Sequence, residues 1–255
     1  MRVLVCIKRV PAPGARIILT EDARSIDTKL LSFAISPHEE CAVEEAVRIA
    51  EASDGTVTVL TLGPSESEDQ LRASLAVGAH QAVLIPTDGS DWDPISTASA
   101  ITSAIQSLEA DGEFDLILFG NESADSGGYQ VGIRVAHGLG RPVVSGIKEI
   151  DVEADSLRLR RETPTGSEIY LVPRPAVVAV KEGINLPRYP TLKGRLNAKK
   201  VEVEQIPAER AASGQRMVRL ITPEIEVSET VILGSGAEAA SAVVDLFEEL
   251  RVVGS

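Results

Sequence analysis

A glycine-rich stretch, GNESADSGGYQVG, fills residues 120–132 between an apolar strand pattern and a helical pattern. Its small residues allow backbone N–H groups to approach a phosphate at the N-terminus of the following helix. Asp125 is placed to hydrogen-bond a ribose or to orient the loop. The expected phosphate cradle is Gly127, Gly128, Tyr129, Gln130 and Val131. An ordinary strand-to-helix turn that needs glycine would have the same pattern, so both interpretations stay open here.

A second unusual stretch, residues 181–200, is rich in glycine, proline and basic residues. Pro187, Pro190 and Gly194 argue against a long regular element. Leu186, Tyr189 and Leu192 stand among the basic residues, and a long loop that presents apolar side chains is often a recognition element. A basic connector packed on its own domain fits the same pattern.

Other motifs carry less chemistry. The segment Gly234-Ser-Gly-Ala-Glu-Ala239 matches G-x-G-x-x-A, but no strand follows its helix to complete a dinucleotide-binding unit. No phosphate-binding G-x-x-x-x-G-K-[ST] motif is present. The three histidines are far apart in sequence and lie beside no cysteine or acidic cluster, so we expect no metal site. No nucleophile–base arrangement indicates an enzyme.

These stretches require a scaffold, and the first 140 residues predict one. Strand patterns at residues 2–8, 56–62, 81–85 and 114–119 alternate with helical patterns at 37–52, 65–77, 94–108 and 129–139. A second, minor strand is expected at 16–20. Ser36, Pro37 and Glu39 form a capping signal for the helix at 37–52. The alternation predicts an α/β fold with a doubly wound parallel sheet, whose strand carboxyl ends meet at one edge.

After Gly140 the pattern changes. Strands are expected at 142–152, 156–161, 167–172, 176–180 and 201–206, with a β-hairpin turn at 163–166 and a short helical piece before Lys200. A last helix is expected at 237–250. We therefore predict a nucleotide-binding α/β domain at residues 1–206, containing the 181–200 loop, and a C-terminal arm with a helix at 207–255.

Composition excludes several classes of protein. The net charge of −13 argues against binding to nucleic acid or to an anionic membrane surface. Two cysteines make no disulfide framework, which favours a reducing cytoplasm. We see no signal peptide and no apolar run long enough to insert into a membrane.

Four segments are together similar to the beta subunits of electron transfer flavoproteins. They are RVLVCIKRVP, ISPHEECAVEEAVRIAE, GNESADSGGYQVG and RRETPTGSEIYLVPRPAVVAVKEGINLPRYPTLKGRLNAKK. The second resembles the family's N-P-x-x-x-x-A-V-E-E-A helix start, and the third its G-x-Q-A-x-D-x-x-x-x-Q loop. The fourth resembles its R-E-x-x-G-G-x-E, L-P-A-V-V-x-V, N-x-P-R-Y-x-x-L and A-K-K signature. The resemblance covers residues 1–206.

The resemblance implies a Rossmann-like fold of the adenine nucleotide alpha-hydrolase type and a role as an electron carrier subunit rather than an enzyme. Such a beta subunit pairs with an alpha subunit that holds most of the FAD site, and it buries AMP. Electrons pass from a dehydrogenase, such as an acyl-CoA dehydrogenase of fatty acid oxidation, to the flavin and then to a quinone oxidoreductase. The C-terminal arm would pack on the partner subunit.

The resemblance also assigns residues. The AMP pocket would be lined by Cys6, Ser36, Leu62 and the run from Gly120 to Val131, including Asp125 and Ser126. His38 would face the flavin, and Glu162 would contact the flavin domain. The 181–200 loop is then a recognition loop in which Leu192 anchors the dehydrogenase, accompanied by Leu186, Pro187, Arg188, Tyr189, Lys199 and Lys200.

Departures from the family pattern concern the exact nucleotide and flavin contacts, not the membership. Ser36 replaces an asparagine, His38 an aromatic residue, and Val131 a threonine or alanine. Residues 165–167 read Thr-Gly-Ser where the family has Gly-Gly. The alternatives are an electron-bifurcating beta subunit with a second FAD, a stand-alone adenine-nucleotide-binding protein of the universal-stress type, and a nicotinamide-dependent oxidoreductase that uses residues 234–239.

Overall fold

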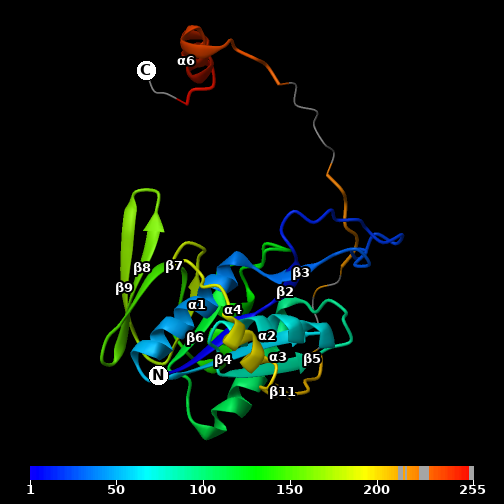
Figure 1. Cartoon of the computed structure of the whole chain (residues 1–255), viewed down its shortest axis with the longest axis vertical. Helices are drawn as coiled ribbons and strands as arrows, with labels where there is room; N and C mark the ends of the chain where they lie inside the picture. Colours follow the sequence, from blue (N-terminus) through cyan, green and yellow to red (C-terminus); the bar gives the residue numbers. More distant parts are fainter. Residues whose placement is uncertain (212–214, 216, 224–229, 253–255) are drawn as a thin grey trace. The chain divides into compact units, whose positions relative to one another are not determined.

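A computed structural model describes residues 1–211, 215, 217–223 and 230–252. It divides into two compact units, Met1–Arg219 and Leu220–Ser255 (Figure 1). Among the described residues, no helix is both long enough and apolar enough to cross a membrane.

The first unit is built on a nine-stranded sheet with the strand order β11-β5-β4-β1-β6-β10-β7-β8-β9. The pairs from β11 to β7 are all parallel, and the β7–β8 and β8–β9 pairs are antiparallel. The predicted doubly wound parallel sheet is therefore confirmed. Its strands are β1 (Arg2–Ile7), β4 (Thr56–Gly63), β5 (Gln81–Pro86), β6 (Leu116–Gly120), β7 (Val143–Val152), β8 (Ser156–Thr163), β9 (Gly166–Pro173), β10 (Ala176–Val180) and β11 (Val203–Gln205).

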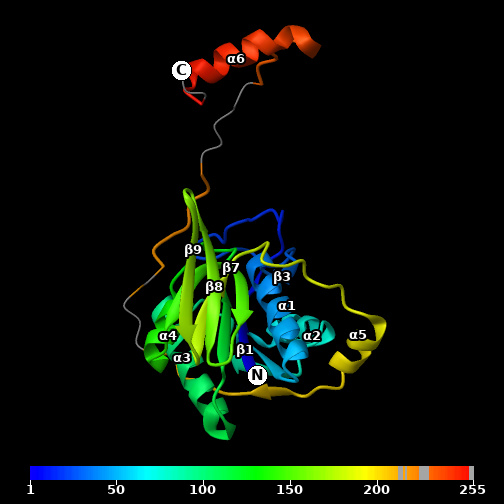
Figure 2. The ribbon, with the colours of Figure 1, turned by 90° about the vertical axis from the view of Figure 1, so that its left-hand side faces the viewer.

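Helices cover both faces of this sheet, as Figure 2 shows. On one face lie α1 (Pro37–Ala52), α2 (Glu68–Ala76) and α5 (Leu192–Ala198), and on the other lie α3 (Pro94–Leu108) and α4 (Val131–Leu139). Successive residues of β1 alternate between the two hydrophobic clusters, because strand side chains point to opposite faces. Val3, Val5 and Ile7 join the α1 side, while Leu4 and Cys6 join the α3 side.

Local signals place the helix ends. The Ser36 side chain accepts a hydrogen bond from the Glu39 N–H at 3.4 Å, and Pro37 occupies the first turn of α1, as the capping signal predicts. Asp93 caps α3 in the same way. Helix α4 ends at Gly140, whose φ of +67° is the left-handed conformation that glycine adopts without a steric cost.

Three expectations about local structure differ from what the structure shows. Residues 16–20 form no strand, and Leu19 makes only an isolated bridge to Ile26. A two-stranded antiparallel sheet forms instead between β2 (Arg9–Pro11) and β3 (Phe33–Ile35). Strand β2 directly follows β1, and β3 directly precedes α1. Helix α4 begins at Val131 rather than at residue 129, after a loop in which Ser123 exchanges backbone hydrogen bonds with Gly127 and Gly128. Residues 65–67 are a 3-10 turn, η1, that leads into α2.

The β8–β9 hairpin rises from the sheet on the same side as residues 12–32, in both views. Its edge strand β9 exposes Ile169 and Leu171. The second unit contains a 3-10 turn, η3 (Gly236–Ala239), followed by α6 (Ala240–Glu249). Within this unit Val244 and Phe247 of α6 are exposed.

Candidate functional site

The carboxyl edge of the sheet is the place where the predicted nucleotide residues meet. The chain winds from β1 to β4 and β5 in one direction, and then to β6 and β10 on the other side of β1. In such sheets the point where the strand order reverses, here the ends of β1 and β6, is the usual ligand position. The ends of β4, β1 and β6 are neighbours there, which brings Leu62, Cys6 and Gly120 to one edge.

A buried carboxylate, Glu39, supports this edge. Its Oε2 accepts the N–H of Lys8, the first residue after β1, at 3.0 Å. Burial raises the pKa of Glu39 to about 7, although hydrogen bonds from the amides of Lys8 and Ser36 and the Lys8 charge act in the opposite direction. The sequence predicts Glu39 only as a partner in helix capping, since a capping pattern does not show which strand end the carboxyl will meet.

Gly120 permits β6 to end directly against the start of α1. A Cβ on Gly120 would lie 2.7 Å from Glu39 Cγ and 3.2 Å from His38 Cβ. A side chain at this position would therefore push the first turn of α1 away from the sheet. The glycine has a packing role at the candidate site, independent of any ligand.

The 121–130 loop is ordered by its own polar groups and by β1. Lys8 Nζ pairs with Asp125 Oδ2 at 2.6 Å, and the Ser123 and Ser126 hydroxyls lie 2.8 Å apart. Burial alone would raise the pKa of Asp125, but Lys8 and the hydrogen bonds from Ser123 and Ser126 outweigh it and lower the pKa. Asp125 thus links the loop to Lys8 at the end of β1.

The N-terminus of α4 has the features of an anion cradle. Gln130 stands at the N-cap position, but no side-chain hydrogen bond caps the helix, and its Oε1 instead accepts from Arg134. The first-turn N–H groups, beginning at Val131, therefore have no capping side chain. Gly127 has φ +60°, and a Cβ there would meet no atom within 4 Å. Open space and uncapped N–H groups together fit a phosphate.

His38 connects this loop with the segment after β10. Its Nδ1 accepts the N–H of Glu182 at 2.7 Å, and its Nε2 lies 3.6 Å from Glu122 Oε1. A hydrogen bond from Tyr129 lowers the pKa of Glu122, with a further contribution from His38. The side chains of His38 and Tyr129 thus both interact with Glu122.

The remaining predicted pocket residues are less accessible. Ser36 is buried and its hydroxyl serves the cap of α1. Cys6 is buried, and burial, reinforced by the charge of Glu39, raises the pKa of its thiol. Leu62 is partly buried against the α3-side cluster. Cys6 and Leu62 can therefore offer a ligand little beyond their backbone and an apolar surface.

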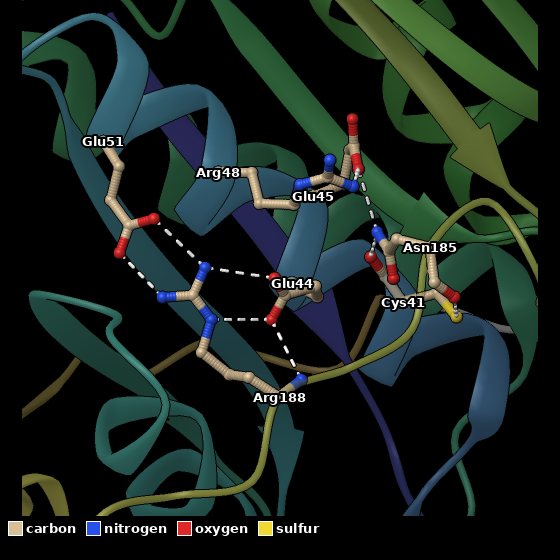
Figure 3. A network of polar contacts seen from close by, with 7 residues as sticks. All are labelled: Cys41, Glu44, Glu45, Arg48, Glu51, Asn185 and Arg188. Carbon is tan, nitrogen blue, oxygen red and sulfur yellow. Dashed lines mark hydrogen bonds and ion pairs between the residues drawn. The ribbon is translucent and has the colours of Figure 1, made fainter.

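The recognition loop lies along α1 and exposes apolar side chains. Leu186, Tyr189 and Leu192 are 89%, 93% and 76% exposed. Arg188 is different, because its side chain turns back to Glu44 and Glu51 of α1, as Figure 3 shows. Pro187 is half-buried, and Lys199 and Lys200, beyond the end of α5, are exposed.

Glu162 lies on β8, close to the tip of the hairpin. Its Oε1 is 3.3 Å from Arg160 Nη1, and more than half of its side chain is exposed. Arg160 also pairs with Glu149 of β7. Glu162 is therefore accessible to a partner, although it already has one cationic neighbour on its own chain.

The comparisons with known proteins decide the family. Residues 26–211 match the family described as electron transfer flavoprotein domain. The chain is 31% identical over 99% of its length to all of the electron transfer flavoprotein subunit beta of Thermoanaerobacterium thermosaccharolyticum, and 30% identical, with the same coverage, to that of Bacillus subtilis. The beta subunit of Mycobacterium tuberculosis strain H37Rv is 35% identical, over 79% of this chain and 77% of its own.

The chain belongs to the electron transfer flavoprotein beta-subunit family. The resemblance drawn from the four sequence segments is thereby confirmed. The matched residues 26–211 contain α1, the 121–130 loop, the hairpin and the recognition loop, so both candidate surfaces of this family member lie within the family domain.

The sequence alone does not indicate several residues that the structure places at the two candidate surfaces of this family member. Lys8, Glu39 and Glu122 organise the nucleotide edge, and Glu44 and Asn185 hold the recognition loop. Each makes its decisive contact with a residue distant in sequence. The one sequence feature that could have pointed to them is their position. Lys8 follows a buried strand, and Glu44 and Glu45 interrupt the apolar face of a helix. In the described part of the chain, no group of three histidine, cysteine or acidic residues could hold a metal ion.

Proposed function

We propose that this chain is the beta subunit of a heterodimeric electron transfer flavoprotein, an electron carrier and not an enzyme. The observation that carries the proposal is the similarity to beta subunits over nearly the whole chain. FAD, held mainly by the alpha subunit, supplies the redox chemistry. The beta subunit contributes a support for that cofactor, in a complex that we place in the cytoplasm.

The nucleotide edge of this chain binds AMP in the proposal. The phosphate lies against the uncapped N-terminus of α4 and the backbone of Gly127 and Gly128, where N–H groups and open space support an anion. Ser36, His38, Leu62 and the end of β1 lie at the same edge of the sheet. Because α1 and the 121–130 loop both meet this edge, bound AMP would join them.

The recognition loop docks the electron-donating dehydrogenase, for example an acyl-CoA dehydrogenase. Three strongly exposed apolar side chains support this: Leu186, Tyr189 and Leu192. The loop also contains six basic residues and one acidic residue within a chain of net charge −13. This combination suits a partner with an apolar pocket and an acidic rim. A quinone oxidoreductase then accepts the electrons.

The remaining surfaces are assigned to the alpha subunit. Residues 207–255 form an arm that packs on it, which the exposure of Val231, Ile232 and Phe247 supports. Glu162, accessible near the hairpin tip, contacts the flavin domain. An alpha subunit would cover the apolar side chains that the isolated chain leaves exposed.

The first test is co-expression with the alpha subunit encoded in the same genome, followed by mass spectrometry of nucleotides released from the denatured complex. We expect a yellow heterodimer with about one FAD and one AMP, as the resemblance to the family implies. Two FAD per heterodimer would instead favour an electron-bifurcating member. A stable homodimer that binds ATP, or a purified complex without flavin, would contradict the proposal.

The second test addresses the anchor. Replacing Leu192 with alanine should raise the KM of the dehydrogenase for the carrier by roughly one to two orders of magnitude, since a buried leucine anchor contributes about 1.5–3 kcal/mol. The content of FAD and AMP should not change. Leu30→Ala, at a leucine that is even more exposed and lies elsewhere in the first unit, is the control. Loss of cofactor in Leu192→Ala would assign the residue to the structure of the subunit instead.

A further inference from the structure

Arg188 occupies the middle of the recognition loop, but its side chain, 35% exposed, turns back onto α1. Its Nε and Nη2 donate to the two oxygens of Glu44 at 2.9 and 3.0 Å. Its Nη1 and Nη2 donate to Glu51 at 2.7 and 3.1 Å, and its backbone N–H donates to Glu44 at 3.1 Å. The guanidinium thus joins two carboxylates of α1, one of which, Glu44, has a side chain only 8% exposed.

A second attachment lies three residues earlier. Asn185 Nδ2 donates to the carbonyl oxygen of Cys41 at 3.0 Å and to Glu45 Oε2 at 2.8 Å. Cys41, Glu44 and Glu45 lie within little more than one turn of α1, so the loop follows the helix, as Figure 3 shows. The charge of Arg188 is held there strongly, since the hydrogen bonds that it donates to Glu51 and Glu44 raise its pKa.

We propose that Arg188 and Asn185 are positioning residues that fasten the recognition loop to α1 and so hold Leu186 and Tyr189 in one outward orientation before the dehydrogenase arrives. The inference rests on the proposed docking role of this loop. It changes the role of Arg188, which the sequence assigns to direct recognition.

The physical reason is the cost of ordering a loop upon binding. Leu186 and Tyr189 adjoin the two attachments in sequence, and Pro187 and Pro190 restrict the backbone between and after them. A loop already held in its docking conformation does not lose that freedom when it binds, so more of the contact energy appears as affinity. Exposed apolar side chains on an unattached loop would dock more weakly.

Arginine suits this position better than lysine. A planar guanidinium presents five N–H donors in a fixed fork, so it can pair with both oxygens of Glu44 and still reach Glu51. A lysine ammonium keeps the positive charge and the long-range attraction to an acidic partner, but it cannot reproduce that geometry. Arg188→Lys therefore separates the shape of the contact from its charge.

The experiment compares heterodimers carrying Arg188→Lys, Glu44→Gln and, as an exposed cation outside the recognition loop, Arg24→Lys. Electron transfer from the dehydrogenase is measured as KM and kcat, together with hydrogen exchange of residues 181–191 and the bound FAD and nucleotide. We expect KM to rise on the order of tenfold in Arg188→Lys. Exchange across the loop should become faster, while kcat and cofactor content stay unchanged and the Arg24→Lys control behaves as the wild type.

Glu44→Gln is the decisive variant, because Glu44 is too buried to touch a partner. It should raise KM and speed exchange in the same direction as Arg188→Lys. A higher KM in Arg188→Lys with unchanged loop exchange and a normal Glu44→Gln would mean that Arg188 touches the partner, which overturns the positioning role. If Leu192→Ala also leaves KM unchanged, the docking role of the loop fails, whereas an effect of Leu192→Ala alone rejects only the role of Arg188 and Asn185.

Discussion

Glu39→Gln tests the view that a carboxylate buried at an energetic cost supports the nucleotide edge. In the folded chain Glu39 is buried between β1, β6 and α1, and burial raises its pKa to about 7 from an ordinary value of 4.5. Glutamine has the same shape and keeps an oxygen that can accept the Lys8 N–H. The substitution therefore removes the charge and leaves the packing.

The sign of the effect follows from the two pKa values. At pH 8 the carboxyl is ionised in both states, and holding it as a buried carboxylate costs about 3 kcal/mol relative to the unfolded chain. Between pH 7 and 4.5 the folded chain binds the proton more tightly, so the free energy of unfolding increases as pH falls. This is the reverse of a carboxyl whose pKa is lowered by folding. Because glutamine loses the stronger, charged hydrogen bonds, we expect a net gain of about 1–3 kcal/mol at pH 8.

The assay is urea unfolding of the full-length chain and of the Glu39→Gln variant at pH 5, 6, 7 and 8, with Glu21→Gln as an exposed control. The stability difference between Glu39→Gln and the wild type should be largest at pH 8 and should shrink toward zero at pH 5. A difference that is independent of pH, or a wild type more stable than the variant at pH 8, would refute the reasoning. The control should show neither the gain nor its pH dependence.

Two glycine substitutions test close approaches of the backbone. Gly120→Ala should destabilise the chain by about 1–3 kcal/mol in urea and weaken AMP binding in calorimetry, since its Cβ would displace Glu39 and the start of α1. Gly127→Ala, whose Cβ meets open space, should cost only about 1 kcal/mol of backbone strain, and equal losses in the two variants would contradict the packing argument. Gly194→Ala should detach α5 from α2, because its Cβ would collide with the carbonyl oxygen of Ala76, and the melting temperature should fall while hydrogen exchange in α5 accelerates. An unchanged melting temperature would show that α5 does not depend on this approach.

Much of the scaffold can be predicted because its signals are local. Helices α1 and α3 and strand β10 have the predicted bounds, since caps, prolines and apolar periodicity act over a few residues. The strand expected at residues 16–20 is absent because a strand needs a partner, which a local pattern does not supply. In this part of the chain β2 and β3 pair instead, and β3 begins twenty-two residues after the end of β2. Sequence patterns indicate which segments can form strands, but they do not show which strands pair.

By itself the sequence determined the fold class, the family and the two stretches that carry the candidate function, residues 120–132 and 181–200. Only the tertiary structure decided how those stretches are held. It placed Glu39 beneath the end of β1, paired Lys8 with Asp125, and turned Arg188 back onto α1. Family motifs and periodicity are properties of neighbouring residues, whereas burial, pKa and ion pairing depend on contacts between residues that can be more than one hundred positions apart.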